Sequence, residues 1–407
     1  MSAHFGPARR RRPATAVCVV AAAVALTATA CDSGGGESKK ASDSPSSQAK
    51  QPSRGEKEKS GLPDELPKKL PSSLQDLDKW RNGGWKNWDR DQWLREAKDF
   101  VNPIIKNLWN KKRMKDADGN DRKVRDRDID KSPSGGKNGT GEDEGVTDPT
   151  PPKVKAKAVK LPYGKATPPV GKVFMDTPKG AMVCSGTVVK DPRHPGKSNL
   201  VATAGHCVHA GKKGGWYRNI VFVPHYNPKG LPNSRLNSVP KKQVAPKGIW
   251  WAKYASTTKH WIDNGGEIGG QGASKDFAVL RVQPEDKRAA SLEQTVGKAV
   301  RVNFKTPRVK AISRLSPYGY PAAPPYDGSR MYSCTDRPRR LSIDPKLPTM
   351  YRVGCTMTGG SSGGGWLSPG GTELLSVTSI GPVGGGWLAG ARLGPDAERA
   401  FTTISKK

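Results

Sequence analysis

Short apolar runs rich in β-branched residues recur along the chain from about Gly171 to its end, separated by Gly, Pro and Asn. Several short strands punctuated by turns are typical of an all-β sandwich or barrel. We therefore predict one folded domain over residues 166–407, with room for one all-β unit or two packed barrels. Residues 394–401 predict a closing helix with Pro395 near its first turn. The apolar runs fall at 173–175, 182–189, 200–204, 220–223, 249–251, 277–282, 299–302, 350–353, 374–379 and 387–391.

The N-terminus has the organisation of an export signal. Four Arg residues at 9–12 precede an apolar stretch at 17–26 that is too short to span a membrane. The sequence Ala-Thr-Ala-Cys at 28–31 resembles the lipobox of bacterial lipoproteins, in which the Cys becomes the lipidated first residue. We expect a signal peptide over residues 1–30 and lipidation of Cys31, which would anchor the protein on the outer face of a bacterial cytoplasmic membrane. The alternative is ordinary cleavage after one of the preceding alanines, followed by secretion.

Polar segments separate this signal from the predicted domain. Residues 31–73 and 130–165 contain few large apolar side chains, which predicts a flexible tether and a linker. Between them, the Trp-rich segment 74–129 is expected to be partly helical. It is interpreted as an arm or pro-segment that docks on the domain, as an amphipathic element at a membrane surface, or as largely disordered. The acidic run from Asp116 to Asp121 lacks the residues that a calcium loop requires and is interpreted as a solvated charged run. No metal site or cofactor is predicted.

The charge of the chain favours an anionic partner. Lys and Arg number 69 against 37 Asp and Glu, for a net charge of +32, and within residues 165–407 the counts are 36 and 14. Such a balance suggests attraction to an anionic cell wall or membrane surface. A nucleic-acid partner is not expected, because the chain has an export signal and no groove-reading motif.

Three short motifs within the predicted domain carry its chemistry. The first joins the strand at 184–189 to Ala-Gly-His-Cys at 204–207, the second is the Asp that opens the apolar run at 276–280, and the third is Gly-Gly-Ser-Ser-Gly-Gly at 359–364. In this order they resemble the trypsin-like serine peptidases, particularly the secreted bacterial branch, over residues 168–405. The resemblance implies two packed antiparallel six-stranded β-barrels with a C-terminal helix.

The resemblance also assigns catalytic roles. A serine hydroxyl is a poor nucleophile at neutral pH, so it needs a base within reach and a carboxylate that orients the base. By this resemblance Ser362 attacks the scissile carbonyl, His206 takes its proton and Asp276 holds the imidazole. The backbone N–H groups of Gly360 and Ser362 would form the oxyanion hole.

The cysteines agree with export. Of the six Cys, Cys18 and Cys31 belong to the signal region, and the remaining four predict two disulfides in an exported chain. Spacing alone leaves three connectivities open. The resemblance implies the pairs Cys184–Cys207 and Cys334–Cys355.

Substrate selection is less defined. By the resemblance, Ser379, Ile380 and Gly381 line the primary pocket, and Ser379 also hydrogen-bonds Asp276. The residue before the nucleophile is neutral Ser361 and not an Asp that pairs with a freshly cut N-terminus, so activity should not require that ion pair. No acidic residue lies between positions 355 and 362, and no His lies beyond residue 260. Both observations favour an apolar or small pocket.

The motifs together predict an exported serine endopeptidase that acts as a monomer on protein or peptide substrates through an acyl-enzyme. The alternative is a catalytically poor trypsin-like domain that binds anionic cell-envelope polymers.

Overall fold

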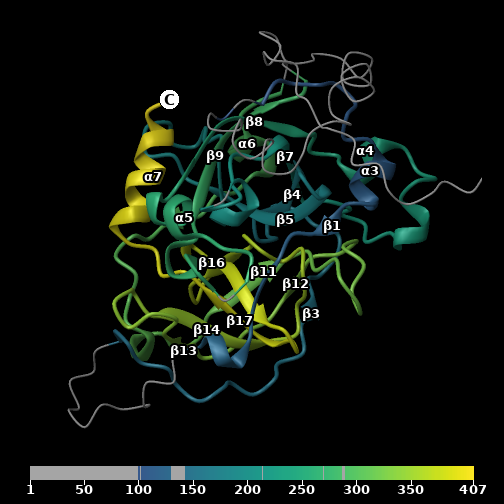
Figure 1. Cartoon of the computed structure of the whole chain (residues 1–407). Helices are drawn as coiled ribbons and strands as arrows, with labels where there is room; N and C mark the ends of the chain where they lie inside the picture. Colours follow the sequence, from purple (N-terminus) through teal and green to yellow (C-terminus); the bar gives the residue numbers. More distant parts are fainter. Residues whose placement is uncertain (1–99, 101, 130–142, 213, 269, 287–288) are drawn as a thin grey trace, which may run out of the picture. The chain divides into compact units, whose positions relative to one another are not determined.

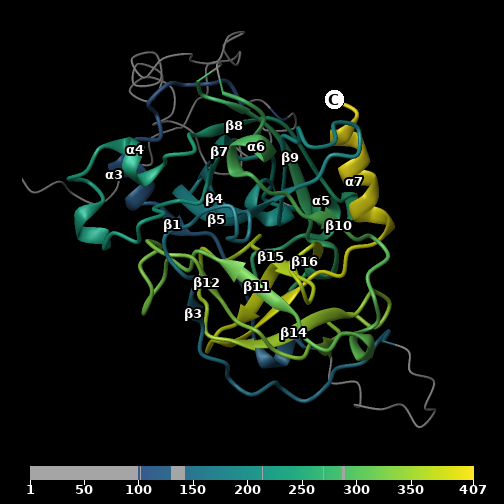
Figure 2. The ribbon, with the colours of Figure 1, turned by 180° about the vertical axis from the view of Figure 1, so that it is seen from behind.

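The computed structural model describes residues 100, 102–129, 143–212, 214–268, 270–286 and 289–407. Within this part, two β-sheets carry the fold (Figures 1 and 2). The predicted signal peptide, the lipidation site Cys31 and the tether lie outside the described residues. In the described part of the chain, no helix combines the length and the hydrophobicity needed to cross a bilayer.

The first sheet closes into a six-stranded barrel. Its order is β5-β4-β7-β8-β9-β6, and β6 pairs back with β5. All six neighbouring pairs are antiparallel. The barrel strands are β4 (Val170–Thr177), β5 (Gly180–Val189), β6 (Leu200–Thr203), β7 (Arg218–Pro224), β8 (Trp250–Thr257) and β9 (Ala278–Pro284).

Apolar side chains from all sides fill this barrel. Val173, Val201, Phe222 and Leu280 come from four different strands and are fully buried in one cluster. Their burial supplies the main favourable term for folding, at about 25 cal/mol per Å² of apolar surface removed from water. The predicted strands at 173–175, 200–204, 220–223 and 277–282 therefore lie where the sequence pattern indicates.

The second sheet stays open. Its order is β13-β14-β17-β16-β15-β11-β12-β3, and among the described residues no pairing joins its two ends. The all-β class is confirmed, but only the first of the two predicted barrels is closed, and the second is a half-barrel. Its strands are β3 (Lys157–Ala158), β11 (Ser316–Gly319), β12 (Tyr332–Ser333), β13 (Arg339–Leu341), β14 (Met350–Cys355), β15 (Gly365–Leu367), β16 (Glu373–Pro382) and β17 (Gly386–Gly390).

Three short strands join these sheets in the parallel sense. β1 (Asp118–Gly119) pairs with β5 of the barrel, whereas β2 (Arg122–Val124) and β10 (Arg301–Val302) pair with β16 of the second sheet. The segment that contains β1 and β2 therefore bridges the two sheets (Figure 1).

The predicted closing helix is α7 (Pro395–Ser405), which lies beside β9 (Figure 1). Pro395 occupies its first turn, and Phe401 and Ile404 are buried on the face toward the barrel. The other helices are short: α3 (Lys111–Lys115), α4 (Lys241–Val244), α5 (Lys259–Asn264), α6 (Leu292–Val296), η2 (Asp126–Asp128), η3 (Gly205–Cys207), η4 (Asn233–Arg235), η5 (Ala273–Lys275) and η6 (Val309–Ala311).

Residues N-terminal to the predicted domain also pack against it. Trp109 is fully buried, and its Nε1 donates a hydrogen bond of 2.7 Å to the Asn219 carbonyl. In the segment interpreted as a linker, Asp143 forms a buried ion pair with Arg392 at 3.0 Å, and Asp148 pairs with Arg340 at 2.7 Å. The folded unit is therefore larger than residues 166–407.

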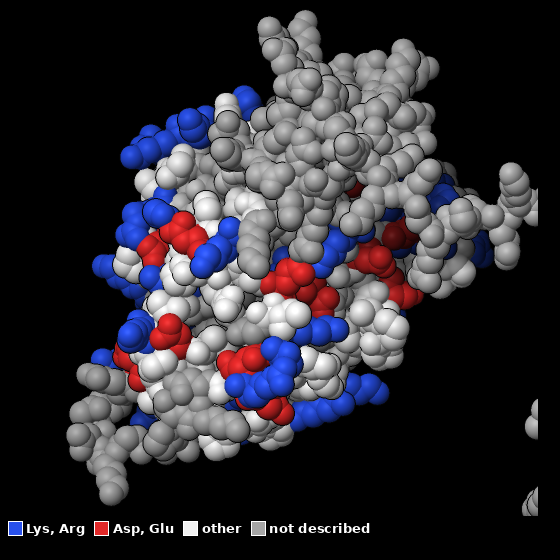
Figure 3. Space-filling model, viewed as in Figure 1, with Lys and Arg blue, Asp and Glu red and all other residues white. Residues whose placement is uncertain are grey.

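The surface carries mixed charge. On the face shown in Figure 3, Lys and Arg side chains stand in several small groups with acidic side chains among them. Several of the cations on the described surface take part in ion pairs, such as Lys179 with Glu267 and Lys241 with Glu285. Part of the positive charge is therefore compensated locally.

Candidate active site

His206 lies in the single turn η3 at the end of β6, and its side chain is fully buried. Two features fix this turn. The next residue, Cys207, forms a disulfide with Cys184 of β5. The preceding residue is Gly205, where a Cβ would come within 2.6 Å of Thr257 Oγ1, so no larger residue fits without displacement. The second disulfide, Cys334–Cys355, joins the half-barrel, so both pairings expected from the resemblance are present.

Asp276 lies between η5 and β9 and is also fully buried. Its Oδ2 lies 2.6 Å from His206 Nδ1, and its Oδ1 accepts a hydrogen bond of 2.9 Å from the His206 backbone N–H. The Ser379 hydroxyl donates a third hydrogen bond to Oδ2 at 2.6 Å. A buried carboxylate is costly unless it is hydrogen-bonded. These contacts satisfy it and leave His206 Nε2 as the nitrogen that faces away from Asp276.

Ser362 lies in the glycine-rich loop between β14 and β15 and is 3% exposed. The loop is tied to β5, since Ser185 N donates to the Ser362 carbonyl at 2.7 Å and Ser185 Oγ donates to the Gly360 carbonyl at 2.9 Å. Gly363 has φ of +75°, and a Cβ there would come within 2.1 Å of Thr203 Oγ1, so glycine is required. Among the described residues, no hydrogen bond joins Ser362 Oγ to His206.

The amides beside Ser362 have the chemistry of an anion site. In the part of the chain that the structure describes, neither the Gly360 N–H nor the Ser362 N–H donates to another protein group. Gly360 has φ of +95°, a conformation that favours glycine. The preceding Ser361 is buried, and its hydroxyl donates to the Thr358 carbonyl at 2.7 Å. The turn is therefore held by a neutral hydroxyl, and no carboxylate at position 361 takes part.

A cavity of about 370 Å³ opens beside Ser362. Ile380 and Gly381 lie on its wall, whereas Ser379 points to Asp276 instead. Among the side chains that line it from residues 166–407, none is charged, and Met357, Trp387 and Leu388 make part of the lining apolar. Such a cavity suits an apolar side chain, because burying an unpaired charge is costly.

Residues 118–124 enter this site, which the sequence analysis did not anticipate. Asn120 is only 6% exposed, so the expectation of a solvated charged run is wrong at this position, and the following Arg122 is also buried, at 7%. The Asn120 carbonyl oxygen lies 3.2 Å from His206 Nε2. Asp121, Arg122 and Lys123 lie on the border of the cavity beside Ser362. No apolar periodicity marks this segment, and its partners are remote in sequence.

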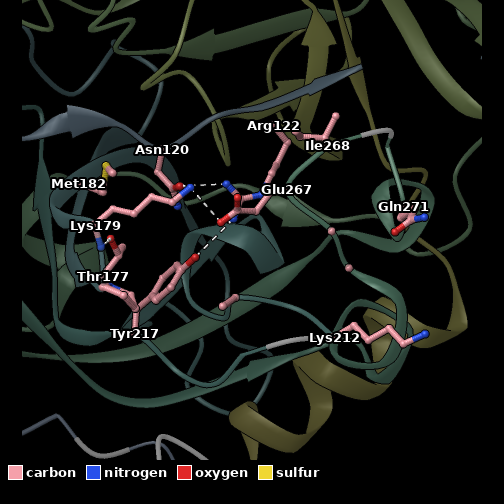
Figure 4. A pocket seen from close by; sticks show the side chains of 14 residues that line it. Asn120, Arg122, Thr177, Lys179, Met182, Lys212, Tyr217, Glu267, Ile268 and Gln271 are labelled. Carbon is pink, nitrogen blue, oxygen red and sulfur yellow. Dashed lines mark hydrogen bonds and ion pairs between the residues drawn. The ribbon is translucent and has the colours of Figure 1, made fainter. Parts of the chain in front are cut away.

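A second cavity, of about 540 Å³, also borders this segment (Figure 4). Asn120 and Arg122 form part of its lining together with Tyr217, Lys179 and Glu267. One ion pair and one hydrogen bond border it. Lys179 pairs with Glu267 at 2.9 Å, and Arg122 Nη2 donates to the Tyr217 hydroxyl at 3.4 Å.

No family model and no curated protein sequence matches this chain. Solved structures do. The thermostable serine protease AL20 from an extremophilic microorganism is 30% identical over 60% of this chain and 99% of that one, with a TM-score of 0.48. The protease Anisep from Arthrobacter nicotinovorans is 27% identical over 59% of this chain and 98% of that one, with a TM-score of 0.47.

The identity to AL20 extends over almost the whole of that protein. A closed six-stranded barrel beside a half-barrel is the chymotrypsin fold of the serine proteases. In this chymotrypsin-fold chain, the closed barrel supplies His206 and Asp276 and the half-barrel supplies Ser362 and Ser379. The candidate site therefore lies where the two sheets meet.

Proposed function

We propose that this chain is an exported serine endopeptidase that cleaves peptide bonds through a Ser-His-Asp triad and an acyl-enzyme. The observation that carries the proposal is the buried contact of 2.6 Å between His206 Nδ1 and Asp276 Oδ2. Beside it, the Ser362 loop has two backbone N–H groups that donate no hydrogen bond to another described protein group. A structural His–Asp pair would not need those amides, whereas acyl transfer needs both features.

In the proposed reaction, Ser362 Oγ attacks the carbonyl carbon of the scissile bond while His206 Nε2 takes the hydroxyl proton. The carbonyl oxygen becomes an oxyanion and accepts hydrogen bonds from the amides of Gly360 and Ser362. His206 then returns the proton to the leaving amine, which releases the first product. Water attacks the remaining ester by the same route in reverse, with His206 as base, and Ser362 is regenerated.

The proposed substrates are protein or peptide chains with an apolar residue before the cleaved bond. Support comes from the uncharged lining that residues 166–407 give to the cavity beside Ser362, in which Met357, Ile380 and Trp387 take part. A Lys or Arg side chain would find no carboxylate among these lining residues. An acidic side chain would find no cation among them.

Export is part of the proposal. Two disulfides support it, because disulfides persist in oxidising compartments outside the cytosol. The predicted signal peptide and lipidation of Cys31 would then place the domain on the outer face of the membrane or, after ordinary cleavage, in the medium.

The decisive experiment is labelling of the full chain with a fluorophosphonate probe, which forms a covalent bond with an activated serine. Labelling that is present in the native protein and lost in Ser362→Ala and in His206→Ala supports the triad. Ser376→Ala is the matched control, because Ser376 donates to the Ala391 carbonyl and has no catalytic role in the proposal. Absence of Ser362-dependent labelling in every form of the protein would instead favour the catalytically poor binding domain.

A further inference from the structure

A segment of the chain's own backbone lies across the proposed catalytic groups. We call residues Asp118–Val124 the strap. Its first part, β1, runs parallel to β5 with Gly119 opposite Val183, and its last part, β2, runs parallel to β16 with Arg122 opposite Ile380. Between these pairings the strap passes over His206, so it spans the cleft from one sheet to the other.

The strap engages the base that the reaction requires. The Asn120 carbonyl oxygen lies 3.2 Å from His206 Nε2, and this contact is a hydrogen bond only when Nε2 carries a proton. The same nitrogen must be free of a proton to accept one from Ser362. The strap carbonyl therefore favours the form of His206 in which Nε2 carries a proton, and in that form His206 cannot act as the base.

The strap also covers the proposed oxyanion site. A Cβ built on Gly119 would lie 2.6 Å from the carbonyl carbon of Gly359 and 2.8 Å from the amide nitrogen of Gly360. The strap backbone is therefore seated directly on the peptide group that would stabilise the oxyanion, and only glycine leaves enough room. The carbonyl of Asn120 faces His206, so this oxygen is not in position to accept from the Gly360 and Ser362 amides.

Side chains fasten the strap in this position (Figure 4). Asn120 Nδ2 donates to the His206 carbonyl at 2.8 Å, and Asn120 Oδ1 accepts from Arg122 Nη1 at 3.2 Å. Arg122 Nη2 contacts the Tyr217 hydroxyl at 3.4 Å. Val124 is fully buried in a cluster that includes Trp387. Polar and apolar contacts thus hold both ends of the strap.

The chain before the strap is anchored on the barrel. Trp109, Leu108 and Met114 are buried in one apolar cluster with Phe174 of β4. Arg113 stacks over the Trp109 ring at 4.4 Å and pairs with Asp176. The strap is therefore delivered to the cleft by a docked segment, and the contacts of that segment add to those of the strap itself.

We propose that the strap is a built-in inhibitor: the cleft of this chain binds residues 118–124 of the same chain, and the peptidase becomes active when they leave. This inference rests on the proposed function. It adds that the strap backbone lowers the activity of the intact chain, because it lies on the base and on the oxyanion site.

The test compares fluorophosphonate labelling rates of full-length variants. Asn120→Ala removes the side-chain hydrogen bonds of the strap and leaves the Gly359–Gly360 loop unaltered, so we expect labelling about ten-fold faster than in the native chain. Gly119→Val should accelerate it further by steric expulsion. Gly164→Val is the matched control, since a Cβ at Gly164 meets nothing within 4 Å, and it should label at the native rate. Thermal unfolding checks that each variant is folded.

The outcomes separate the two proposals. Slow labelling of the native chain with faster labelling of Asn120→Ala supports the strap, even if Gly119→Val perturbs the loop. Equal, Ser362-dependent labelling of the native chain and Asn120→Ala overturns the strap and leaves the peptidase standing. If no variant is labelled, the peptidase proposal fails and the strap proposal falls with it.

A peptide experiment tests the geometry. A synthetic peptide of residues 116–125 should inhibit labelling of Asn120→Ala and remain uncut by mass spectrometry, whereas a scrambled peptide should not inhibit. Rapid cleavage of the peptide within residues 118–124 would show that these residues are a substrate and would contradict the blocked arrangement.

Discussion

The hydroxyl of Ser379 donates a hydrogen bond of 2.6 Å to Asp276 Oδ2, the same carboxylate oxygen that faces His206 Nδ1. This bond connects strand β16, which borders the substrate cavity, with the residue that orients the proposed base. Because both groups are buried, Ser379 restrains the carboxylate in one position.

Replacing Ser379 tests this positioning role. A hydrogen bond to a charged group contributes about 1.5–3 kcal/mol, so Ser379→Ala should lower kcat/KM by about ten- to a hundred-fold if the whole contribution acts on the transition state. The measurement is hydrolysis of a cleaved peptide in the Asn120→Ala background. Ser376→Ala on the same strand is the control, because Ser376 bonds the Ala391 carbonyl and does not touch the triad. Equal losses in both variants would mean that Ser379 has only a structural role.

Cleavage preference should follow the lining of the cavity. In a peptide library, we expect apolar residues before the cleaved bond to be preferred over Lys, Arg, Asp and Glu by about ten-fold or more, because a buried unpaired charge is costly. Gly381→Asp places a carboxylate on the cavity wall and should raise the share of Lys and Arg. A preference of the Asn120→Ala variant for a charged residue at this position would contradict the proposed substrate class.

The two disulfides should differ in their effect on catalysis and agree in their effect on stability. They close loops of 23 and 21 residues, so removing either by paired Cys→Ala substitution should cost about 3 kcal/mol in the free energy of unfolding. Only the loss of Cys184–Cys207, which flanks His206, should also reduce the labelling rate of the folded protein. Denaturant titration and probe labelling together distinguish the two effects.

Stability should rise with pH because of Lys172. This residue is buried in β4, where desolvation lowers its pKa to about 7, and its Nζ donates to the Gly328 carbonyl at 3.1 Å near the Tyr226 ring and Asp327. The unfolded chain then binds more protons than the folded one between pH 7 and 10.5. The contribution to the free energy of unfolding therefore increases across that window, by up to about 1.4 kcal/mol per pH unit.

Urea unfolding at pH 7 and pH 9 measures this contribution. The rise should be smaller in Lys172→Met than in the native chain. It should be unchanged in Lys190→Met, which replaces an exposed lysine at the end of the neighbouring strand. An identical rise in all three proteins would show that Lys172 keeps an ordinary pKa.

Much of the fold could be predicted because its determinants are local. Apolar runs mark the strands of the barrel, and Pro395 followed by apolar residues marks α7. The motifs around His206, Asp276 and Ser362 could be found for the same reason. Only the structure shows that His206 Nδ1 and Asp276 Oδ2 lie 2.6 Å apart.

The strap could not be predicted, because its conformation depends on distant partners. Asn120 meets His206, 86 positions further along the chain, and Arg122 lies opposite Ile380 of β16. β1 has two residues and β2 has three, and strands this short show no detectable hydrophobic period. The open second sheet escaped prediction for a similar reason, since closure depends on how β13 and β3 meet and not on any single strand.

Trp109 docks the segment that carries the strap onto the peptidase domain of the same chain, and this fixes the ratio of inhibitor to peptidase. An inhibitor that shares a chain with its target is always present one to one, at an effective concentration of the order of millimolar for a short connection. Dilution of the protein into a large volume outside the cell would not release it. Only an event that acts on the covalent chain or on its docked residues could change the balance, so the timing of activity would be set at the location of each molecule and not by the amount made.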